Sequence, residues 1–253
     1  MCGRFVSTTP AAQLAAYFDV DLVTGAAESH RPDTNTAPTS DVLVVVETDD
    51  VRRLDAFHWG LVPSWAKDPS IGNRMINARS ETAAEKPSFR RAFTRRRCLV
   101  PVDGFYEWAR VAGQKVKQPY FIHRPDDEPY ALAGLWEQWT PPTPDGPDLP
   151  DEHEAPPAQV PLRSVTILTT GANRAMAAVH DRMPVVVPPS GWDAWLSPQV
   201  QDREVVSEFL VAAPDALFRL RPVSTEVNNV RHKGEHLLER VSPIDGAPDG
   251  APD

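Results

Sequence analysis

The stretch RCLVPVDGFYEWAR, residues 97–110, carries the pattern that decides the fold. Its first part, residues 98–102, is a short apolar run with β-branched residues and predicts a buried strand. Its second part, GFYEW at 104–108, is apolar and aromatic around a single carboxylate, Glu107. A polar side chain among such neighbours needs a partner or a function, so Glu107 is either an ion-pair partner or a site residue.

Similar runs recur along the chain and outnumber the helical patterns. The helical patterns are an amphipathic segment after Thr9-Pro10 and two later segments, at 192–196 and 204–213. We therefore predict an α+β fold, a single domain over about residues 2–238, with a mostly antiparallel sheet core and peripheral helices. Further strands are expected at residues 42–47, 54–59, 119–123, 130–139 and 164–170.

Length and composition restrict the class of protein. The 253 residues are 41% hydrophobic, enough for one sizeable core. No apolar run approaches the roughly 20 residues of a membrane span, and the start, MCGRFVSTTP, lacks the apolar stretch of a secretory signal. With only Cys2 and Cys98 a disulfide framework is not expected, so we predict a cytoplasmic protein that is not bound to a membrane.

The net charge of −9 is unevenly distributed. Residues 140–161 hold five acids and eight prolines, and residues 241–253 hold three acids; neither stretch has Lys or Arg. The first is predicted to be a flexible insertion, and residues 239–253 a disordered acidic tail. The remainder is near neutral, and five arginines within residues 90–97 form either a solvated basic face or part of a DNA groove.

Cys2 carries the most specific chemistry. Removal of Met1, expected before a small residue, would leave an α-amino group beside a thiol. Such a 1,2-aminothiol condenses with an aldehyde to an imine, which the thiol closes to a thiazolidine. The α-amino group ordinarily titrates near pH 7.7–8.0, so part of it is neutral and nucleophilic at pH 7. Its position alone favours the interpretation that Cys2 is a small apolar residue in a frayed chain end. The other motifs favour a reactive residue instead.

The segments MCGRF, WGLVPSW, NARSE, PVDGFYEW and HDRMP occur in this order. Together they resemble the SRAP family (SOS response-associated peptidase), whose members include bacterial proteins and a vertebrate protein that shields abasic sites. The resemblance covers about residues 2–238 and implies the SRAP fold, in which the sheet core is barrel-like. It also implies a bacterial protein associated with the nucleoid.

The resemblance assigns catalytic roles to four residues. Cys2 matches the crosslinking residue, and Asn77 the asparagine that hydrogen-bonds near the abasic sugar. Glu107 matches the glutamate that takes a proton from the α-amine, and His180 the histidine that assists sugar ring opening. Such roles are chemically reasonable for these groups, because a carboxylate and an imidazole can relay protons near neutral pH.

The resemblance also implies DNA contacts. Arg4, Arg79 and Arg182 match positions that contact phosphates, as guanidinium groups suit. Trp65 and Pro38 match positions that stack on the DNA or shape its path. Trp65 stands beside Lys67, an aromatic and basic pairing that suits unpaired bases.

Several alternatives stay open. His180 could be a structural histidine, and the remaining histidines lack the spacing of a zinc site, so no metal and no cofactor are expected.

The expected partner is single-stranded DNA with abasic sites, bound by a monomer. The leading function is a covalent, lesion-shielding crosslink with associated lyase activity and removal of Met1. The alternatives are a cysteine peptidase using Cys2, His180 and Glu107, and a non-covalent reader of modified DNA bases.

Overall fold

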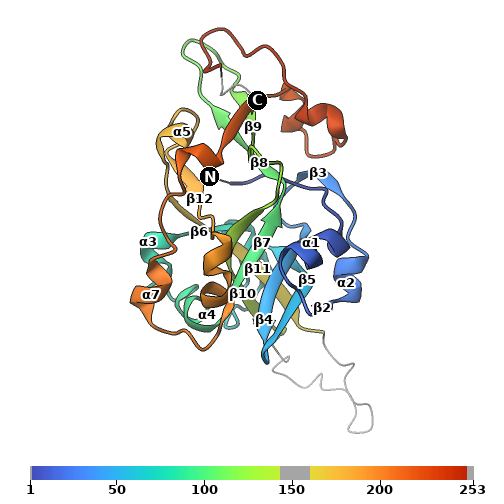
Figure 1. Cartoon of the computed structure of the whole chain (residues 1–253), viewed down its shortest axis with the longest axis vertical. Coiled ribbons are helices and arrows are strands. Elements are labelled where there is room, and N and C mark those ends of the chain that lie inside the picture. The colour runs from blue at the N-terminus through green and yellow to red at the C-terminus, as the bar shows by residue number, and fades with distance from the viewer. Residues whose placement is uncertain (1, 143–159, 250–253) are drawn as a thin grey trace.

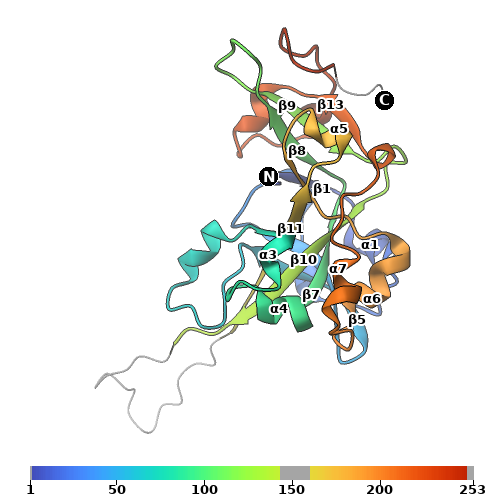
Figure 2. The ribbon, with the colours of Figure 1, turned by 90° about the vertical axis from the view of Figure 1, so that its left-hand side faces the viewer.

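The computed structural model of the chain describes residues 2–142 and 160–249 (Figure 1). Within them the chain forms two β-sheets with short helices around the larger one, which confirms the predicted α+β class. The predicted insertion lies mostly outside the described residues, at 143–159. In Figures 1 and 2 the strands β8 (Gly104–Ala109) and β9 (Gln118–His123) lie above the larger sheet, so the smaller sheet covers one end of it.

The larger sheet has the strand order β12-β11-β10-β7-β4-β5-β2, and β6 also pairs with β11. The pairs are antiparallel except those of β5 with β2 and β11 and that of β6 with β11. The β5–β11 pairing joins only two residue pairs, so the curved sheet forms a ring that is partly closed. The strands are β2 (Leu22–Val23), β4 (Asp41–Thr48), β5 (Val51–Trp59), β6 (Asn77–Arg79), β7 (Arg97–Val102), β10 (Tyr130–Trp139), β11 (Leu162–Gly171) and β12 (Arg182–Pro184).

The smaller sheet places the N-terminus beside the GFYEW strand. Its order is β13-β9-β8-β1-β3, and all of its pairs are antiparallel. The N-terminal strand β1 therefore lies between β3 and β8. Its other strands are β1 (Phe5–Ser7), β3 (Asp33–Thr36) and β13 (Arg219–Pro222).

Successive apolar residues of β4 face two hydrophobic cores, one on each side of the larger sheet. Val44 and Val46 of β4 face a cluster that also contains Phe5 and Phe105 of the smaller sheet. Leu43 and Val45 face the opposite cluster, which the α-helices cover. Because both faces of β4 are buried, its sequence is a continuous apolar run.

Helices are short; the α-helices lie mostly around the larger sheet, and the last two 3-10 helices pack against the smaller one. The α-helices are α1 (Ala11–Tyr17), α2 (Gly25–Glu28), α3 (Ser80–Ala83), α4 (Arg90–Arg95), α5 (Arg174–Ala177), α6 (Trp192–Leu196) and α7 (Arg203–Ser207). The 3-10 helices are η1 (Pro69–Arg74), η2 (Pro189–Gly191), η3 (Asp215–Leu217), η4 (Thr225–Asn228) and η5 (Glu235–Leu238).

Two helical expectations need correction. The helix predicted over 204–213 ends at Ser207, because the next turns use i→i+3 hydrogen bonds that pack Phe209 and Leu210 against the core. Pro10 is the N-cap residue of α1 and not its first helical residue.

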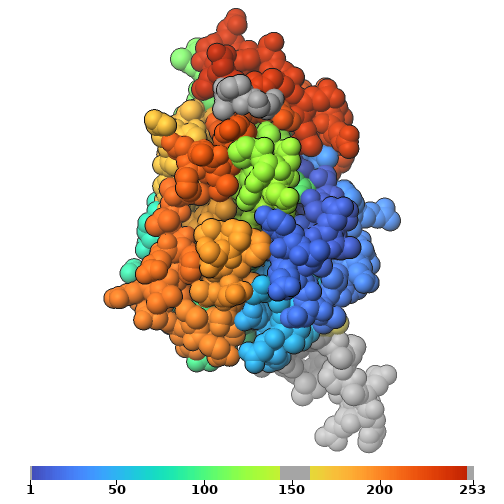
Figure 3. Space-filling model, in the orientation of Figure 1, coloured from blue at the N-terminus to red at the C-terminus, as the bar shows by residue number. Residues whose placement is uncertain are grey.

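The described part of the C-terminal segment is hydrogen-bonded to the smaller sheet. Val241 N–H donates to the Pro222 carbonyl at 2.9 Å, and Ile244 N–H donates to the Gln118 side chain at 2.9 Å. The Tyr120 hydroxyl donates to the Pro248 carbonyl. Figure 3 shows the C-terminal residues, in red, covering the upper end of the molecule. Residues 239–249 therefore lie along the smaller sheet.

Candidate functional site

The N-terminal strand brings Cys2 to the GFYEW strand. Phe5 pairs with Phe105 and Val6 with Gly104. The Tyr106 N–H donates to the Arg4 carbonyl at 2.9 Å, which continues this register toward the N-terminus. In the same antiparallel register Gly3 lies opposite Glu107, so Cys2 and Glu107 are neighbours across the two strands.

The thiol of Cys2 is buried, with a residue exposure of 0%. Burial raises the pKa of the Cys2 thiol far above its ordinary value, and the negative charge of Glu107 raises it further. Glu107 therefore lies within electrostatic range of the Cys2 sulfur. Cys2 is therefore a protonated thiol in a dry environment.

Asn77 reaches the same point from the larger sheet. It is the first residue of β6 and pairs with Ile167 of β11. Its side-chain Nδ2 donates to the Cys2 carbonyl at 2.7 Å. Its Oδ1 is buried and accepts no hydrogen bond from any residue that the structure describes. The amide thus fixes Cys2 and keeps one acceptor available for a ligand.

His180 follows α5 and directly precedes Asp181 and β12. Its neighbour Val179 and Cys2 belong to the same hydrophobic cluster. Nδ1 of His180 accepts the Arg182 N–H at 2.9 Å, and an Asp181 carboxylate oxygen lies 2.8 Å from the same nitrogen. Nδ1 can satisfy only one of these partners at a time: without a hydrogen it accepts from the Arg182 N–H, and with one it donates to Asp181.

Of the three predicted phosphate contacts, Arg182 and Arg4 are held within the protein. Arg182 forms a two-pronged ion pair with Glu81, at 2.5 and 2.9 Å, and donates to the Thr169 carbonyl at 2.5 Å. Arg4 donates to the Asn35 side chain at 2.7 Å and to the Val227 carbonyl at 2.9 Å. A phosphate could bind Arg182 through both of its terminal nitrogens only if Glu81 moved away.

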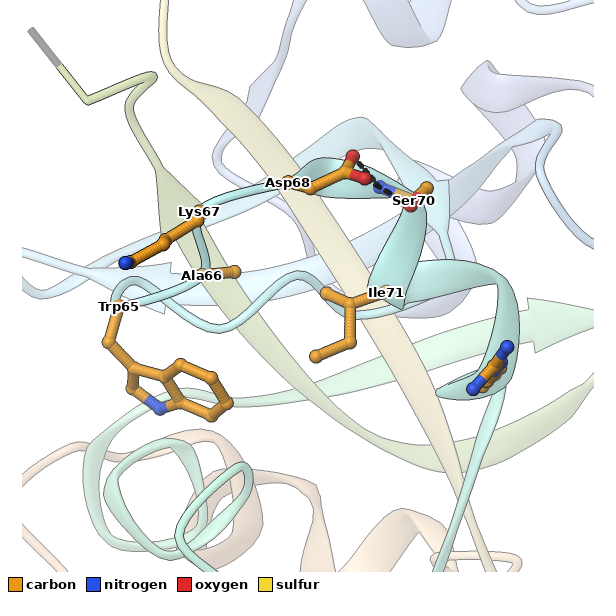
Figure 4. Close-up of a pocket in the computed structure, with 7 residues that line it drawn as sticks. Trp65, Ala66, Lys67, Asp68, Ser70 and Ile71 are labelled. Atoms are coloured by element: carbon orange, nitrogen blue, oxygen red, sulfur yellow. Dashed lines mark hydrogen bonds between the residues drawn. The ribbon is translucent and has the colours of Figure 1, made fainter. Parts of the chain in front are cut away.

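The third predicted phosphate contact, Arg79, is exposed at the end of β6, two residues beyond Asn77. Pro38 lies in the turn between β3 and β4, where Thr39 N–H donates to the Trp59 carbonyl at 2.9 Å. Trp65 is 58% exposed and lines a surface pocket together with Lys67 (Figure 4).

The arginine cluster at 90–97 divides into two parts. Arg97 is buried and donates to five carbonyl oxygens, and burial lowers its pKa to about 10. Arg96 pairs with Glu137 of β10. In Figures 1 and 2, α4, which carries the exposed arginines of the cluster, lies toward the lower end of the larger sheet, below the N-terminus. The exposed arginines therefore lie on a different part of the sheet from the N-terminus.

The structure joins Cys2, Asn77 and Glu107 in one site and places His180 beside the same core. Sequence analysis missed Glu81, although it ends the NARSE motif that contains Arg79. It also missed the role of Asn35, whose side chain bonds Arg4 and the carbonyls of Val227, Asn229 and His232. Nothing in the sequence indicates that Asn35 has partners nearly 200 residues away.

A family model described as SOS response associated peptidase (SRAP) matches residues 1–230. The chain belongs to the SRAP family. Abasic site processing protein YoqW of Bacillus subtilis is 36% identical over 239 residues, covering 94% of this chain and 99% of the relative. YedK of Escherichia coli, named likewise, is 31% identical and covers 95% and 100%. HMCES of Gallus gallus, also named an abasic site processing protein, is 32% identical and covers 94% and 77%.

Solved structures support the SRAP fold. A protein from Bacteroides thetaiotaomicron superimposes with a TM-score of 0.78 at 20% identity, over 95% of this chain and 100% of its own. A phage-related protein from Bordetella bronchiseptica gives 0.60 at 28% identity, covering 88% and 94%. The family and fold predictions are confirmed, whereas the roles of the individual site residues stay predictions.

Residues 2–142 and 160–249 of this SRAP chain lack two features. No helix there is long and apolar enough to cross a membrane. No group of three or more His, Cys, Asp or Glu residues in the same ranges is arranged to hold a metal ion.

Proposed function

We propose that this SRAP protein processes abasic sites in single-stranded DNA by forming a covalent crosslink through Cys2 once Met1 has been removed. One arrangement carries the proposal: a buried Cys2 whose thiol lies beside Glu107 and whose carbonyl is held by Asn77 at 2.7 Å. The names of the relatives, abasic site processing proteins, agree with the substrate.

The reaction forms two bonds at one carbon. The neutral α-amine of Cys2 attacks the C1′ aldehyde of the ring-opened sugar, and the resulting carbinolamine loses water to give an imine. The sulfur of Cys2 then adds to the imine carbon, while the thiol proton passes to the nitrogen, which closes the thiazolidine. Because burial keeps the thiol protonated, this proton is present when the ring closes.

Each neighbouring side chain has a step to assist. Glu107 accepts the proton that the α-amine loses on attack and returns it when water leaves. His180, whose Nδ1 lies within hydrogen-bond distance of the Arg182 N–H and of Asp181, passes a proton to the sugar ring oxygen during opening. The Oδ1 of Asn77 accepts a hydrogen bond from a sugar hydroxyl. Decay of the imine by β-elimination would give a weak lyase activity.

The peptidase alternative places a different demand on Cys2. A cysteine peptidase attacks with a thiolate, and both burial and the charge of Glu107 oppose loss of the thiol proton. A reader of modified bases would need a base pocket but no free N-terminus. Chemistry through the amine therefore fits the surroundings of Cys2 best.

The test is adduct formation with a uracil-containing oligonucleotide, with and without a uracil glycosylase, on a denaturing gel and by intact mass. The wild-type chain should lack Met1 and gain the mass of the abasic strand minus water. A chain extended by one glycine before Cys2, and Cys2→Ala, should give no stable adduct, whereas Cys98→Ala should react normally. A wild-type chain that lacks Met1 and forms no adduct would refute the proposal.

A further inference from the structure

Tyr120 of β9 lies directly opposite Glu107 of β8 in the smaller sheet. Residues that pair in this way point to the same face of a sheet, with their Cβ atoms about 4.5–5.5 Å apart. Tyr120 is 0% exposed and belongs to the hydrophobic cluster that contains Cys2. Its ring therefore forms part of the wall beside the carboxylate that serves as proton acceptor in the proposed function.

The hydroxyl end of Tyr120 is held by the C-terminal segment, residues 241–249. The hydroxyl donates to the carbonyl of Pro248, 128 residues later in the chain. Burial raises the pKa of Tyr120 to about 12, and the negative charge of Asp249 raises it further. The hydroxyl therefore keeps its proton near neutral pH and remains a hydrogen-bond donor.

The sequence of the C-terminal segment explains its path. Gly246 has a φ of +85°, and the Ala247 N–H donates to the Ile244 carbonyl at 2.8 Å, which closes a turn that favours glycine at its third position. The Ile244 N–H donates to Oε1 of Gln118 at 2.9 Å, and the buried Nε2 of the same side chain donates to the Val223 carbonyl at 3.0 Å. The turn is thus anchored to the first residue of β9.

The end of the segment also approaches the chain that leads to His180. In Figures 1 and 2 the C-terminal segment lies at the same end of the molecule as β9 and α5. Pro248 and Asp249 line a surface pocket of about 370 Å³ together with Ala178, two residues before His180. The segment therefore contacts β9 on one side and borders the His180 region on the other.

We infer that Tyr120 is a positioning residue for Glu107 and that residues 241–249 hold it in place. Fixed at its hydroxyl, the ring keeps the carboxylate in one position beside Cys2 and keeps water out of that side of the site. A small misplacement of a reacting group can slow a reaction by about 10²-fold, so a contact that touches no reacting atom can still govern the rate. The inference rests on the proposed function. The segment follows residue 230, where the match with the family model ends.

Single-turnover crosslinking at saturating abasic DNA tests the inference in a double-mutant cycle. Tyr120→Phe keeps the ring and removes the donor, whereas a chain that ends at Arg240 removes the acceptor. Each change should slow crosslinking by about 5- to 50-fold. The combination should be no slower than the truncation alone, within about twofold, because both changes break the same contact. Affinity for an oligonucleotide with a reduced abasic residue, which lacks the aldehyde, should stay within about twofold of wild type.

Tyr130→Phe is the matched control. Tyr130 is equally buried in the same cluster, but its hydroxyl donates to the Leu217 carbonyl at 3.0 Å and it pairs with Val102. Its crosslinking rate should stay near wild type. A chain that ends at Asp249 keeps the Pro248 carbonyl and should also react like wild type. Denaturant unfolding checks that every variant is folded under the assay conditions.

A second measurement does not depend on the crosslink. In a Cys98→Ala background, iodoacetamide should alkylate Cys2 about 2- to 10-fold faster in Tyr120→Phe and in the chain that ends at Arg240, because loss of the hydrogen bond makes local opening of the site more frequent. Wild-type rates of crosslinking and alkylation in both folded variants would overturn the inference, and so would losses of crosslinking rate that add. If wild type forms no adduct while alkylation still depends on Tyr120 and the segment, the proposed function fails and the closure by Tyr120 stands.

Discussion

The surroundings of Cys2 and the pocket at residues 65–74 differ in almost every physical respect. Cys2 is fully buried and has a carboxylate and an amide as neighbours. The pocket is open, and its aromatic ring and cations face solvent. Proton transfer and imine formation benefit from a dry, fixed setting, whereas capture of a charged strand needs exposed groups. One segment, residues 75–77, connects the two regions.

The comparison predicts that changes at the buried region alter reaction rate and changes at the pocket alter affinity. The largest effect should follow Glu107→Gln, because the α-amine then loses its proton acceptor. We expect single-turnover crosslinking at saturating DNA to fall by about 10²- to 10⁴-fold, with DNA affinity nearly unchanged. Raising the pH should partly restore the rate by deprotonating the amine in solution.

Glu137→Gln is the matched control for Glu107→Gln. Glu137 is also 3% exposed and lies on a strand, but it pairs with Arg96 away from Cys2. Its crosslinking rate should stay near wild type in protein that remains folded. Equal rate losses in the two variants would mean that Glu107 only supports the fold.

His180→Ala should slow a different step. Loss of the ring removes the proton donor to the sugar oxygen, so ring opening slows by up to about 10²- to 10⁴-fold and high pH does not restore it. The measurement is a pH series of single-turnover rates beside Glu107→Gln, with exposed His236→Ala as the control. Identical pH responses of the two variants would refute the division of roles.

Substitutions of Trp139 and Trp65 should distinguish a residue that stabilises the fold from one that is free to bind a ligand. Trp139→Ala removes a buried ring and its hydrogen bond to Ala66, so the free energy of unfolding should fall by about 3–5 kcal/mol. Trp65→Ala removes an exposed ring and should change it by less than about 0.5 kcal/mol. Denaturant unfolding measures both, and a large loss for Trp65→Ala would contradict a binding role.

Burial of the two thiols predicts a pH-dependent stability. Burial raises the pKa of both Cys2 and Cys98 in the folded state, while unfolded thiols ionise near pH 8.5. The contribution of the buried thiols to the free energy of unfolding is fully present below about pH 8.5. Above that pH it declines by about 1.4 kcal/mol per pH unit for each thiol. Between about pH 8.5 and 9.5, Cys98→Ala should show about half the wild-type slope in denaturant unfolding. An unchanged slope would contradict burial of Cys98.

The smallest effect should come from Glu81, the partner of Arg182. Glu81→Gln weakens an exposed ion pair worth about 0–1 kcal/mol and releases Arg182 for a phosphate. DNA affinity at low salt should rise by about two- to fivefold and return to the wild-type value at high salt. Glu85→Gln makes the same charge change without touching Arg182. Weaker DNA binding by Glu81→Gln would show instead that Glu81 orients Arg182 for the phosphate.

The sequence alone determined the longer strands and the family, whereas the short strands β1, β2, β3, β6, β12 and β13 were not predicted. Runs such as 42–47 and 98–102 predicted strands because continuous apolar residues with β-branching are buried on both faces of a sheet. The ordered motifs identified Cys2, Asn77 and Glu107 as one site, and the structure places these three together. Local pattern and motif order carry this information without reference to distant contacts.

Only the tertiary structure decided which charged groups are available. Arg97 belongs to a basic run, yet it is buried and donates to three carbonyl oxygens of a segment about 100 residues away. Arg182 is engaged by Glu81, 101 residues earlier, and residues 239–249 lie along the smaller sheet although their composition predicts disorder. These partners are brought together by the packing of the two sheets, which periodicity and composition within one segment do not encode.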